Sequence, residues 1–242
     1  MTFRRYKYYC LSLLLLCLVN ANSYGQTLKE FFKDKNIPLT YLGVDFSSAT
    51  IEGEPAANEL HNKYESINSV IVTEVKKYDV GGAFKRNSST NDLDMINKLN
   101  EASTIKKTSN VGDLEKNMLK PEDIRNHVKA YDLSGKKGIG LVFIMDGMSK
   151  TNKESTMYVT LIDLAKKKVL LAERLTGSTG GFGLRNYWLS PVYKVLNDID
   201  KHRYEDWEEA AEKAPEEKEV VEEPKKAAPA AKEPKAKKVK KA

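Results

Sequence analysis

Residues 138–148, GIGLVFIMDGM, are the most informative stretch of this 242-residue chain, because almost every side chain in them is apolar or small. Two more segments rich in β-branched and aromatic residues follow, STMYVTLIDL at 155–164 and KVLLAERLTG at 168–177, joined by polar connections. This pattern predicts a meander of three antiparallel strands. The first segment is apolar on both faces, so we expect it to lie centrally beneath other elements.

The flanking sequence predicts helices that cover this sheet. Residues 39–46, LTYLGVDF, alternate in polarity and predict an earlier strand. A helix begins at Pro121, and a last helix after the meander has Ser190 as its N-cap and Pro191 as its first residue. Another helix is predicted from a stripe that consists of Ala57, Leu60, Tyr64, Ile67, Ile71 and Val75. The order of elements predicts an α/β (α+β) fold with a mainly antiparallel or mixed sheet, while residues 83–120 give no clear pattern.

The net charge of +6 is unevenly distributed. Residues 205–223 carry ten acidic residues against two lysines, and residues 224–242 carry eight lysines against one glutamate. Residues 1–25 contribute +3, which leaves residues 26–204 with a net charge of +4. So small a surplus gives no electrostatic footprint for nucleic acid, and we expect no nucleic-acid partner.

The C-terminal segment, residues 205–242, consists almost entirely of Glu, Lys, Ala and Pro. It has too little apolar surface to offset a chain entropy of about 1–2 kcal/mol per residue, so we predict a disordered tail, apart from a charged helix at 205–213. The predicted organisation is a signal peptide at 1–25, a single globular α/β domain at 26–204 and this tail. The tail would act as a tether or bind an anionic lipid or polysaccharide.

The first 25 residues have the layout of a secretory signal peptide. Basic residues at positions 4, 5 and 7 precede ten apolar residues at 10–19, which are too few to cross a bilayer as a permanent helix. Ser23 and Gly25 are small residues at the −3 and −1 positions, so we expect cleavage between Gly25 and Gln26, with cleavage after residue 21 or 23 as alternatives. An uncleaved amphipathic anchor is a further alternative.

Both cysteines, Cys10 and Cys17, lie in this N-terminal segment. The mature chain would therefore have no thiol for disulfides, cysteine nucleophiles or cysteine-ligated zinc. No small residue precedes either cysteine, so a lipoprotein anchor is not expected. No later run reaches 18 apolar residues, which predicts a periplasmic or secreted protein without an integral membrane span after processing.

A glycine-rich turn at residues 180–183 precedes the last predicted helix. Its backbone N–H groups could bind an anion, but Asn186 stands where the dinucleotide fingerprint requires its third glycine. We interpret the segment as a strand-to-helix turn and expect no cofactor. Arg, Tyr and Trp dominate contact energies at protein interfaces, so we predict an exposed recognition patch at this turn. Its residues are Gly181, Gly183, Arg185, Asn186, Tyr187 and Trp188.

Three aspartates, Asp45, Asp146 and Asp163, lie on or beside predicted strands. They could form an acid/base pair or bind a hard cation, but strand-end aspartates also hold turns, and we favour this structural role. The three histidines, at positions 61, 127 and 202, fall on three different predicted helices without metal-ligand spacing. We expect neither a metal site nor a catalytic triad.

Three stretches within residues 135–188 resemble an uncharacterised family of secreted proteins typical of Bacteroidetes. They are GKKGIGLVFIMDGMSK at 135–150, VTLIDLAKKKVLLAERLTG at 159–177 and GGFGLRNYW at 180–188. The early Val-Asp-Phe at 44–46 and the late strand–turn–strand pattern are similar to the N-terminal domain of the TolB translocation protein and to the curli-secretion lipoprotein family. These resemblances imply an α/β module that assembles with envelope partners.

The absence of catalytic constellations leads us to expect an exported, non-enzymatic module that binds an envelope or extracellular protein. The alternative is a hydrolase or small-ligand-binding enzyme that uses Asp45, Asp146 or Arg185 in a cleft near the glycine turn. Two of these carboxylates within about 5–9 Å of each other in a concave pocket would favour the hydrolase.

The signal-peptide interpretation makes a direct prediction about the mature N-terminus. Intact-mass measurement of the protein recovered from the cell envelope or the medium should find Gln26 as the first residue, because the signal peptidase would cut after Gly25. Met1 on protein recovered from the cytosol would contradict both the cleavage and the compartment.

Overall fold

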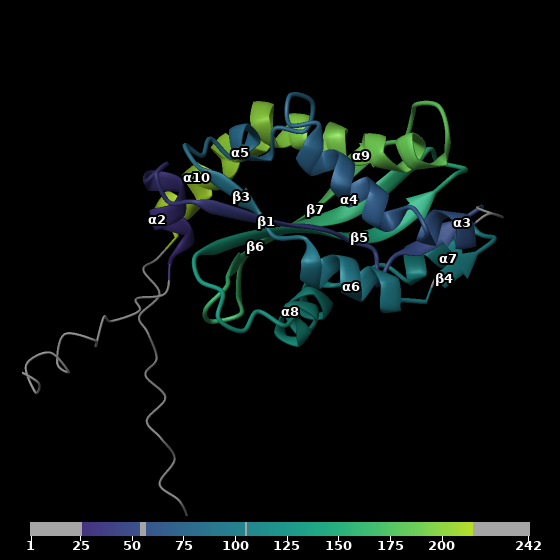
Figure 1. Ribbon diagram of the computed structural model, residues 1–242, viewed down its shortest axis with the longest axis horizontal. Coiled ribbons are helices and arrows are strands. Elements are labelled where there is room, and N and C mark those ends of the chain that lie inside the picture. Colours follow the sequence, from purple (N-terminus) through teal and green to yellow (C-terminus); the bar gives the residue numbers. More distant parts are fainter. Residues whose placement is uncertain (1–25, 54–56, 105, 215–242) are drawn as a thin grey trace, which may run out of the picture.

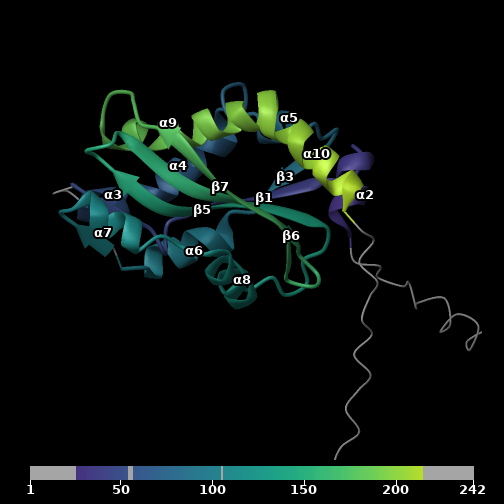
Figure 2. The same ribbon diagram turned by 180° about the vertical axis from the view of Figure 1, so that it is seen from behind.

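The computed structural model describes residues 26–53, 57–104 and 106–214. The predicted signal peptide and residues 215–242 of the predicted tail lie outside this range. A seven-stranded sheet forms the centre of the described chain, with one layer of helices on each face (Figure 1, Figure 2).

The strands and helices follow one another in α/β order. The strands are β1 (Leu39–Asp45), β2 (Thr50–Glu52), β3 (Ser89–Asn91), β4 (Lys106–Thr108), β5 (Ile139–Ser149), β6 (Glu154–Asp163) and β7 (Lys168–Ser178). The helices are α2 (Leu28–Lys33), α3 (Ala57–His61), α4 (Tyr64–Thr73), α5 (Val80–Ala83), α6 (Asp94–Ala102), α7 (Val111–Lys116), α8 (Pro121–Ala130), α9 (Leu184–Asp198), the π-helical turn η1 (Ile199–Arg203) and α10 (Tyr204–Lys213).

The core of the sheet is parallel, so the expectation of a mainly antiparallel sheet is wrong. β1 pairs in parallel with β3 and β5, and β2 pairs in parallel with β4 and β5. The antiparallel pairs of the described strands are β5–β6 and β6–β7, which form the predicted meander. Parallel neighbours need a long crossover, and the helical segment between β1 and β5 provides one. The sequence shows the length of this connection but not which strands it brings together.

Strand β5 lies in the middle of the sheet, and all its residues are buried. One hydrophobic cluster packs β5 against α2, α4, α9 and α10 on the face that we call the upper face. A second cluster packs the lower face against α6 and α8. Burial on both faces explains why the sequence of β5 is continuously apolar, as expected for a parallel strand between two helical layers.

The start of the last long helix differs from the prediction. α9 begins at Leu184, and Pro191 lies inside it rather than at its first position. Proline has no N–H to donate to the carbonyl of Tyr187 one turn earlier, and the hydroxyl of Ser190 donates to that oxygen instead, at 3.1 Å. The N-cap assigned to Ser190 is therefore wrong, because a nearby hydroxyl makes an internal proline tolerable.

The predicted helix from Ala57 to Val75 is also interrupted. It divides into α3 and α4, and α4 ends at Thr73. Leu60, Tyr64, Ile67 and Ile71 are buried as the stripe predicts, whereas the side chain of Val75 is 58% exposed.

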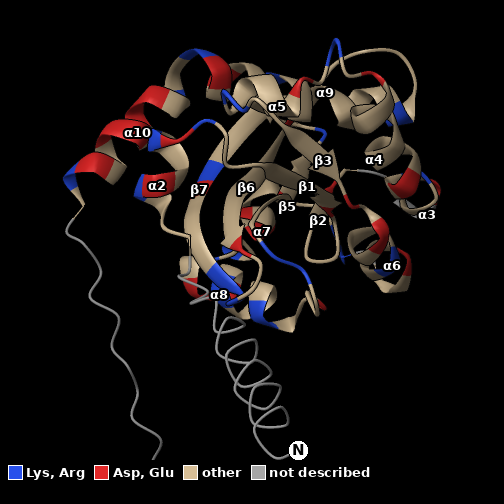
Figure 3. Cartoon of the chain, turned by 60° about the vertical axis from the view of Figure 1, so that its left-hand side comes forward, with Lys and Arg blue, Asp and Glu red and all other residues tan. Residues whose placement is uncertain are grey.

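The folded domain extends beyond the predicted boundary at residue 204. α9 continues through η1 into α10, which buries Tyr204, Trp207 and Ala211 beneath an acidic outer surface (Figure 3). The indole of Trp207 stacks on Phe84 with ring centroids 6.0 Å apart, and its N–H donates to Glu173. The charged helix predicted at 205–213 is therefore present, but it packs on the domain. The acidic residues around its short apolar stripe gave no indication of this packing in the sequence.

Arg86 links α10 to α2 through hydrogen bonds. Its guanidinium donates to the carbonyl oxygens of Phe31 at 2.6 Å and Asp34 at 3.0 Å, and to the hydroxyl of Tyr204 at 2.7 Å. The two carbonyls lie at the C-terminal end of α2, where the helix dipole favours a cation. Arg86 is only 8% exposed, so this contact is part of the core that fixes α2 against α10.

The contribution of α10 can be measured with Trp207→Ala. Removing an indole that is 4% exposed should lower the free energy of unfolding by about 3 kcal/mol, because a cavity remains against Phe84. Glu212→Ala, on the exposed face of the same helix, is the control and should change stability by less than about 0.5 kcal/mol. Equal effects of the two substitutions in urea unfolding would show that α10 is not part of the cooperative fold.

Candidate functional site

The carboxyl ends of the neighbouring strands β1 and β3 are a candidate position for a ligand site. In doubly wound sheets, ligands bind where the connections of neighbouring strands leave on opposite faces. The chain runs from β1 through the short strand β2 and α3 to α4, which packs on the upper face. β3 is followed directly by α6, which packs on the lower face. β3 pairs only as far as Tyr41, so the edge of β1 beyond it lacks a strand partner.

Two buried asparagines fill this crevice. Asn68 of α4 accepts from the Val44 N–H at 2.7 Å and donates to the Val44 carbonyl at 3.2 Å. Asn100 of α6 accepts from the Phe46 N–H at 2.7 Å and donates to the same Val44 carbonyl at 2.8 Å. The asparagine side chains thus replace a missing strand, and the backbone groups that could have bound a phosphate are already bonded.

Asp45 forms a hydrogen-bonded network on the lower face of the same strand end. Its Oδ2 accepts from Nε2 of His127 at 2.7 Å and from the hydroxyl of Tyr131, and its Oδ1 accepts from the Ser47 N–H at 2.8 Å. Burial alone would raise the pKa of Asp45, but the hydrogen bonds and charge of His127, with the bonds from Ser47 and Tyr131, outweigh it and hold this pKa below its usual value. Burial and the charge of Asp45 raise the pKa of Tyr131 well above its usual value, so its phenol stays a donor.

The network contains the residue types of a serine hydrolase but not the geometry. Ser47 Oγ lies 3.2 Å from Nε2 of His127, which is the same nitrogen that binds Asp45. In a triad the carboxylate holds one ring nitrogen and the serine the other. Asp45 and His127 therefore fasten α8 to β1. No sequence pattern indicated this pair, because 82 residues separate its members and only the rotation of α8 brings them together.

The other two predicted aspartates lie in separate environments. Asp146 accepts from the Leu119 N–H at 2.8 Å and from the guanidinium of Arg174. Asp163 accepts from the N–H groups of residues 165 and 166 at 3.0 and 3.1 Å, which is the turn-holding role that we favoured for these aspartates. Asp45, Asp146 and Asp163 each have their own hydrogen-bond partners, and Asp45 and Asp146 share none of the hydrogen bonds found in the described chain.

The exposed aromatic residue of the glycine turn is Phe182, whereas the predicted patch contained Tyr187 and Trp188. Gly181 and Gly183 have φ values of +91° and +82°, a conformation that favours glycine, and Phe182 between them is 95% exposed. The Asn186 side chain donates to the Phe182 carbonyl at 3.1 Å and accepts from Arg185 at 3.2 Å. Trp188, by contrast, is fully buried, so its assignment to an exposed patch is wrong.

Of the remaining patch residues, Tyr187 packs partly on the core, whereas Asn186 is exposed and Arg185 is half-buried. Helical periodicity explains why Trp188 turns inward. A phenylalanine flanked by glycines in a turn was the sequence signal that could have identified the exposed residue.

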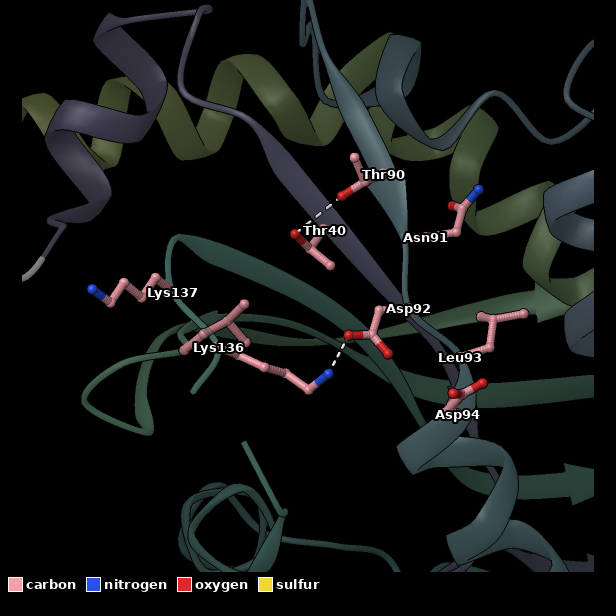
Figure 4. A pocket seen from close by; sticks show the side chains of 9 residues that line it. Thr40, Thr90, Asn91, Asp92, Leu93, Asp94, Lys136 and Lys137 are labelled. Carbon is pink, nitrogen blue, oxygen red and sulfur yellow. Dashed lines mark hydrogen bonds and ion pairs between the residues drawn. The ribbon is translucent and has the colours of Figure 1, made fainter. Parts of the chain in front are cut away.

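Two adjoining hollows lie beside the start of α6. The first has a volume of about 410 Å³ (Figure 4) and the second about 510 Å³. Both are lined by Asp92, Asp94 and Lys136, and Lys136 forms an ion pair with Asp92. The linings also include Lys98, Lys137 and Asp132, so the charges are balanced and select neither anions nor cations. Asp45, Asp146 and Arg185 line neither of these two hollows.

Residues 26–53, 57–104 and 106–214 contain no group of three His, Cys, Asp or Glu side chains that could hold a metal ion. None of the helices described here has both the length and the apolar surface that crossing a bilayer requires.

Comparisons with known proteins add no assignment. No protein-family model matches this chain, and no curated protein matches it. The resemblances to secreted and envelope families stay hypotheses.

The Asp45 network predicts a pH-dependent contribution to stability. Asp45→Asn should lower the free energy of unfolding by about 2–3 kcal/mol at neutral pH, because it removes a buried charge bonded to three donors. A carboxyl group with a depressed native pKa stabilises the fold above its unfolded pKa of about 3.9, and this contribution is lost as pH falls through the lower native value.

Urea unfolding at several pH values tests this expectation. The difference between the wild type and Asp45→Asn should shrink as the pH falls below about 4. Asp113→Asn, which changes an exposed carboxylate, should show little difference at any pH. A wild-type advantage that stays constant into strong acid would contradict the proposed role of the Asp45 charge.

Proposed function

We propose that this protein is an exported, non-enzymatic module that binds an envelope or extracellular protein through the glycine loop, which we define as residues 180–187. The observation that carries the proposal is Phe182, whose side chain is 95% exposed. Burying an aromatic side chain of this size against a partner would contribute about 2 kcal/mol or more.

The glycine loop holds Phe182 in a defined position. Gly181 and Gly183 adopt the positive φ values that the turn requires, and the Asn186 side chain donates a hydrogen bond to the carbonyl of Phe182 itself. Arg185 braces Asn186 through two guanidinium nitrogens, at 3.2 and 3.3 Å. A contact residue that is already positioned loses less conformational entropy on binding, which favours its use as an anchor.

The arrangement of the buried acids supports a non-enzymatic role. Asp45, Glu52 and Asp146 are each less than 5% exposed, and each is hydrogen-bonded to groups of this chain. Glu52, for example, accepts from the hydroxyls of Ser149 at 2.9 Å and Thr151 at 2.7 Å. Carboxylates engaged in this way stabilise the fold and have little capacity left for a substrate.

The rival hypothesis of a hydrolase requires distant groups to share one cavity. Arg185 belongs to α9 on the upper face, whereas Asp45 bonds to His127 of α8 on the lower face. The sheet lies between these two helices (Figure 1). This separation favours the binding module over an enzyme that combines Arg185 with Asp45.

The two ends of the described chain suggest how such a module is oriented. α2 and α10 pack together at one end of the molecule, and α9 starts at the other end (Figure 1). The helical run from Leu184 to Lys213 spans about 45 Å at 1.5 Å per residue. If residues after 214 tether the protein to an anionic lipid or polysaccharide, as the basic tail suggests, the glycine loop would point away from that surface.

Phe182→Ser tests this function. The test is capture of proteins from an envelope fraction, quantified by mass spectrometry. At least one protein should bind the wild-type chain and be retained roughly 10- to 30-fold less by Phe182→Ser. The reason is that an anchoring aromatic side chain contributes about 2 kcal/mol to binding.

Val75→Ser is the matched control, because Val75 is the other large apolar side chain of the described chain that is mostly exposed, at 58%. It should capture the same proteins as the wild type. Identical capture by the wild type and Phe182→Ser, with both variants folded by circular dichroism, would refute the proposed binding surface.

A further inference from the structure

Strand β7 forms a long open edge of the sheet. It spans Lys168–Ser178 and pairs with β6, while no other strand of the described chain pairs with it. The opposite edges, β3 and β4, are only three residues long each. Long edges with apolar side chains are templates for pairing with another strand.

The middle of β7 lacks two of the usual devices that prevent such pairing, which are proline and charged side chains. Residues 169–172 are Val-Leu-Leu-Ala, they are half-buried, and they contain no proline or charge. Helices lie above and below the strand, since α9 and α8 both contact β7. The free side of β7 is therefore its backbone edge, which faces the viewer in Figure 2 between these two layers.

A β-bulge gives this edge an unusual symmetry. Val169 pairs with Ile162 and Leu171 with Leu161, so Leu170 is an extra residue in β7. Leu170 and Leu171 both pack with the upper hydrophobic cluster, whereas Val169 and Ala172 pack with the lower one. The order of faces along residues 169–172 is lower, upper, upper, lower, and it reads the same in both directions.

The charges that flank this run complete the pattern. Lys168 precedes it and is exposed, and Glu173 follows it with a side chain that is 35% exposed. Glu173 lies on the upper face, where it bonds to Trp207 and Arg203. A carboxylate has about four acceptor positions, so these two bonds leave capacity for a lysine.

From this symmetry we infer that β7 pairs antiparallel with β7 of a second copy of this chain, around a two-fold axis between Leu170 and Leu171. This register places Leu170 opposite Leu171 of the second copy and Val169 opposite Ala172 of the second copy. Lys168 then lies opposite Glu173 of the second copy, once on each side of the axis.

The bulge is what allows this register. In a regular strand, two-fold mates on the same face are separated by an even number of residues, and Lys168 and Glu173 could not meet. The extra residue at Leu170 shifts the alternation of faces by one position. The two residues of each facing pair between 168 and 173 therefore lie on the same face of the sheet. Like surfaces that match around a two-fold axis are typical of homodimers, and for this reason we assign the edge to a second copy rather than to another protein.

Zero-length carbodiimide cross-linking of the wild-type protein tests the register. Lys168 and Glu173 of one chain are about 15 Å apart along the strand, too far for a direct amide link. A covalent dimer that yields a Lys168–Glu173 cross-linked peptide would therefore support the proposed pairing. Monomer at all concentrations, or a dimer linked only through other residues, would overturn it.

Lys168→Glu provides an independent measurement by light scattering after size exclusion. It places like charges opposite each other at two symmetric positions, so the dissociation constant of the dimer should rise by about tenfold. Lys194→Glu, on the exposed face of α9, makes the same change in net charge and should leave the dimer intact. Equal dimerisation of Lys168→Glu and Lys194→Glu would overturn the proposal, whatever the outcome for Phe182.

Discussion

The structure depends on how the backbone N–H and carbonyl groups of β1 are hydrogen-bonded beyond Tyr41, where the pairing with β3 ends. A buried N–H or carbonyl group without a hydrogen bond costs about 1–3 kcal/mol, and β1 continues into the core beyond Tyr41 without a strand on its outer edge. Asn68 and Asn100 bond to Val44 and Phe46 in place of that strand. The same bonds fix α4 and α6 on opposite faces of the sheet and fill the crevice in which a doubly wound fold would hold a ligand.

The lower face follows a similar principle with a charged group. Asp45 is fully buried at the end of β1, and its bonds to His127 and Tyr131 attach α8 to the sheet. An aspartate, a histidine and a serine therefore lie together without the geometry of a hydrolase. Buried polar side chains of this chain thus position its helices on the sheet. The two surfaces proposed for contact with other molecules are the glycine loop and the edge of β7.

Several elements were predictable because they are governed by neighbours in the sequence. The meander of β5, β6 and β7 has short polar turns, and α8 begins with Pro121 as the sequence indicates. The wrong predictions of strand direction and of burial involve contacts between distant segments. The parallel pairing of β1 with β5, the burial of Trp188 and the packing of Trp207 against Phe84 each depend on an element far away in the chain.

By itself, the sequence determined the strands of the meander and the polarity of each segment, because these follow from side-chain periodicity and turn chemistry. Only the tertiary structure decided the direction of the core strands, the partners of Asp45 and Asp146, and which aromatic residue of the glycine loop faces solvent. The physical reason is that hydrogen bonds and burial between distant segments depend on the rotation and register of whole elements. A pattern within one segment does not contain that information.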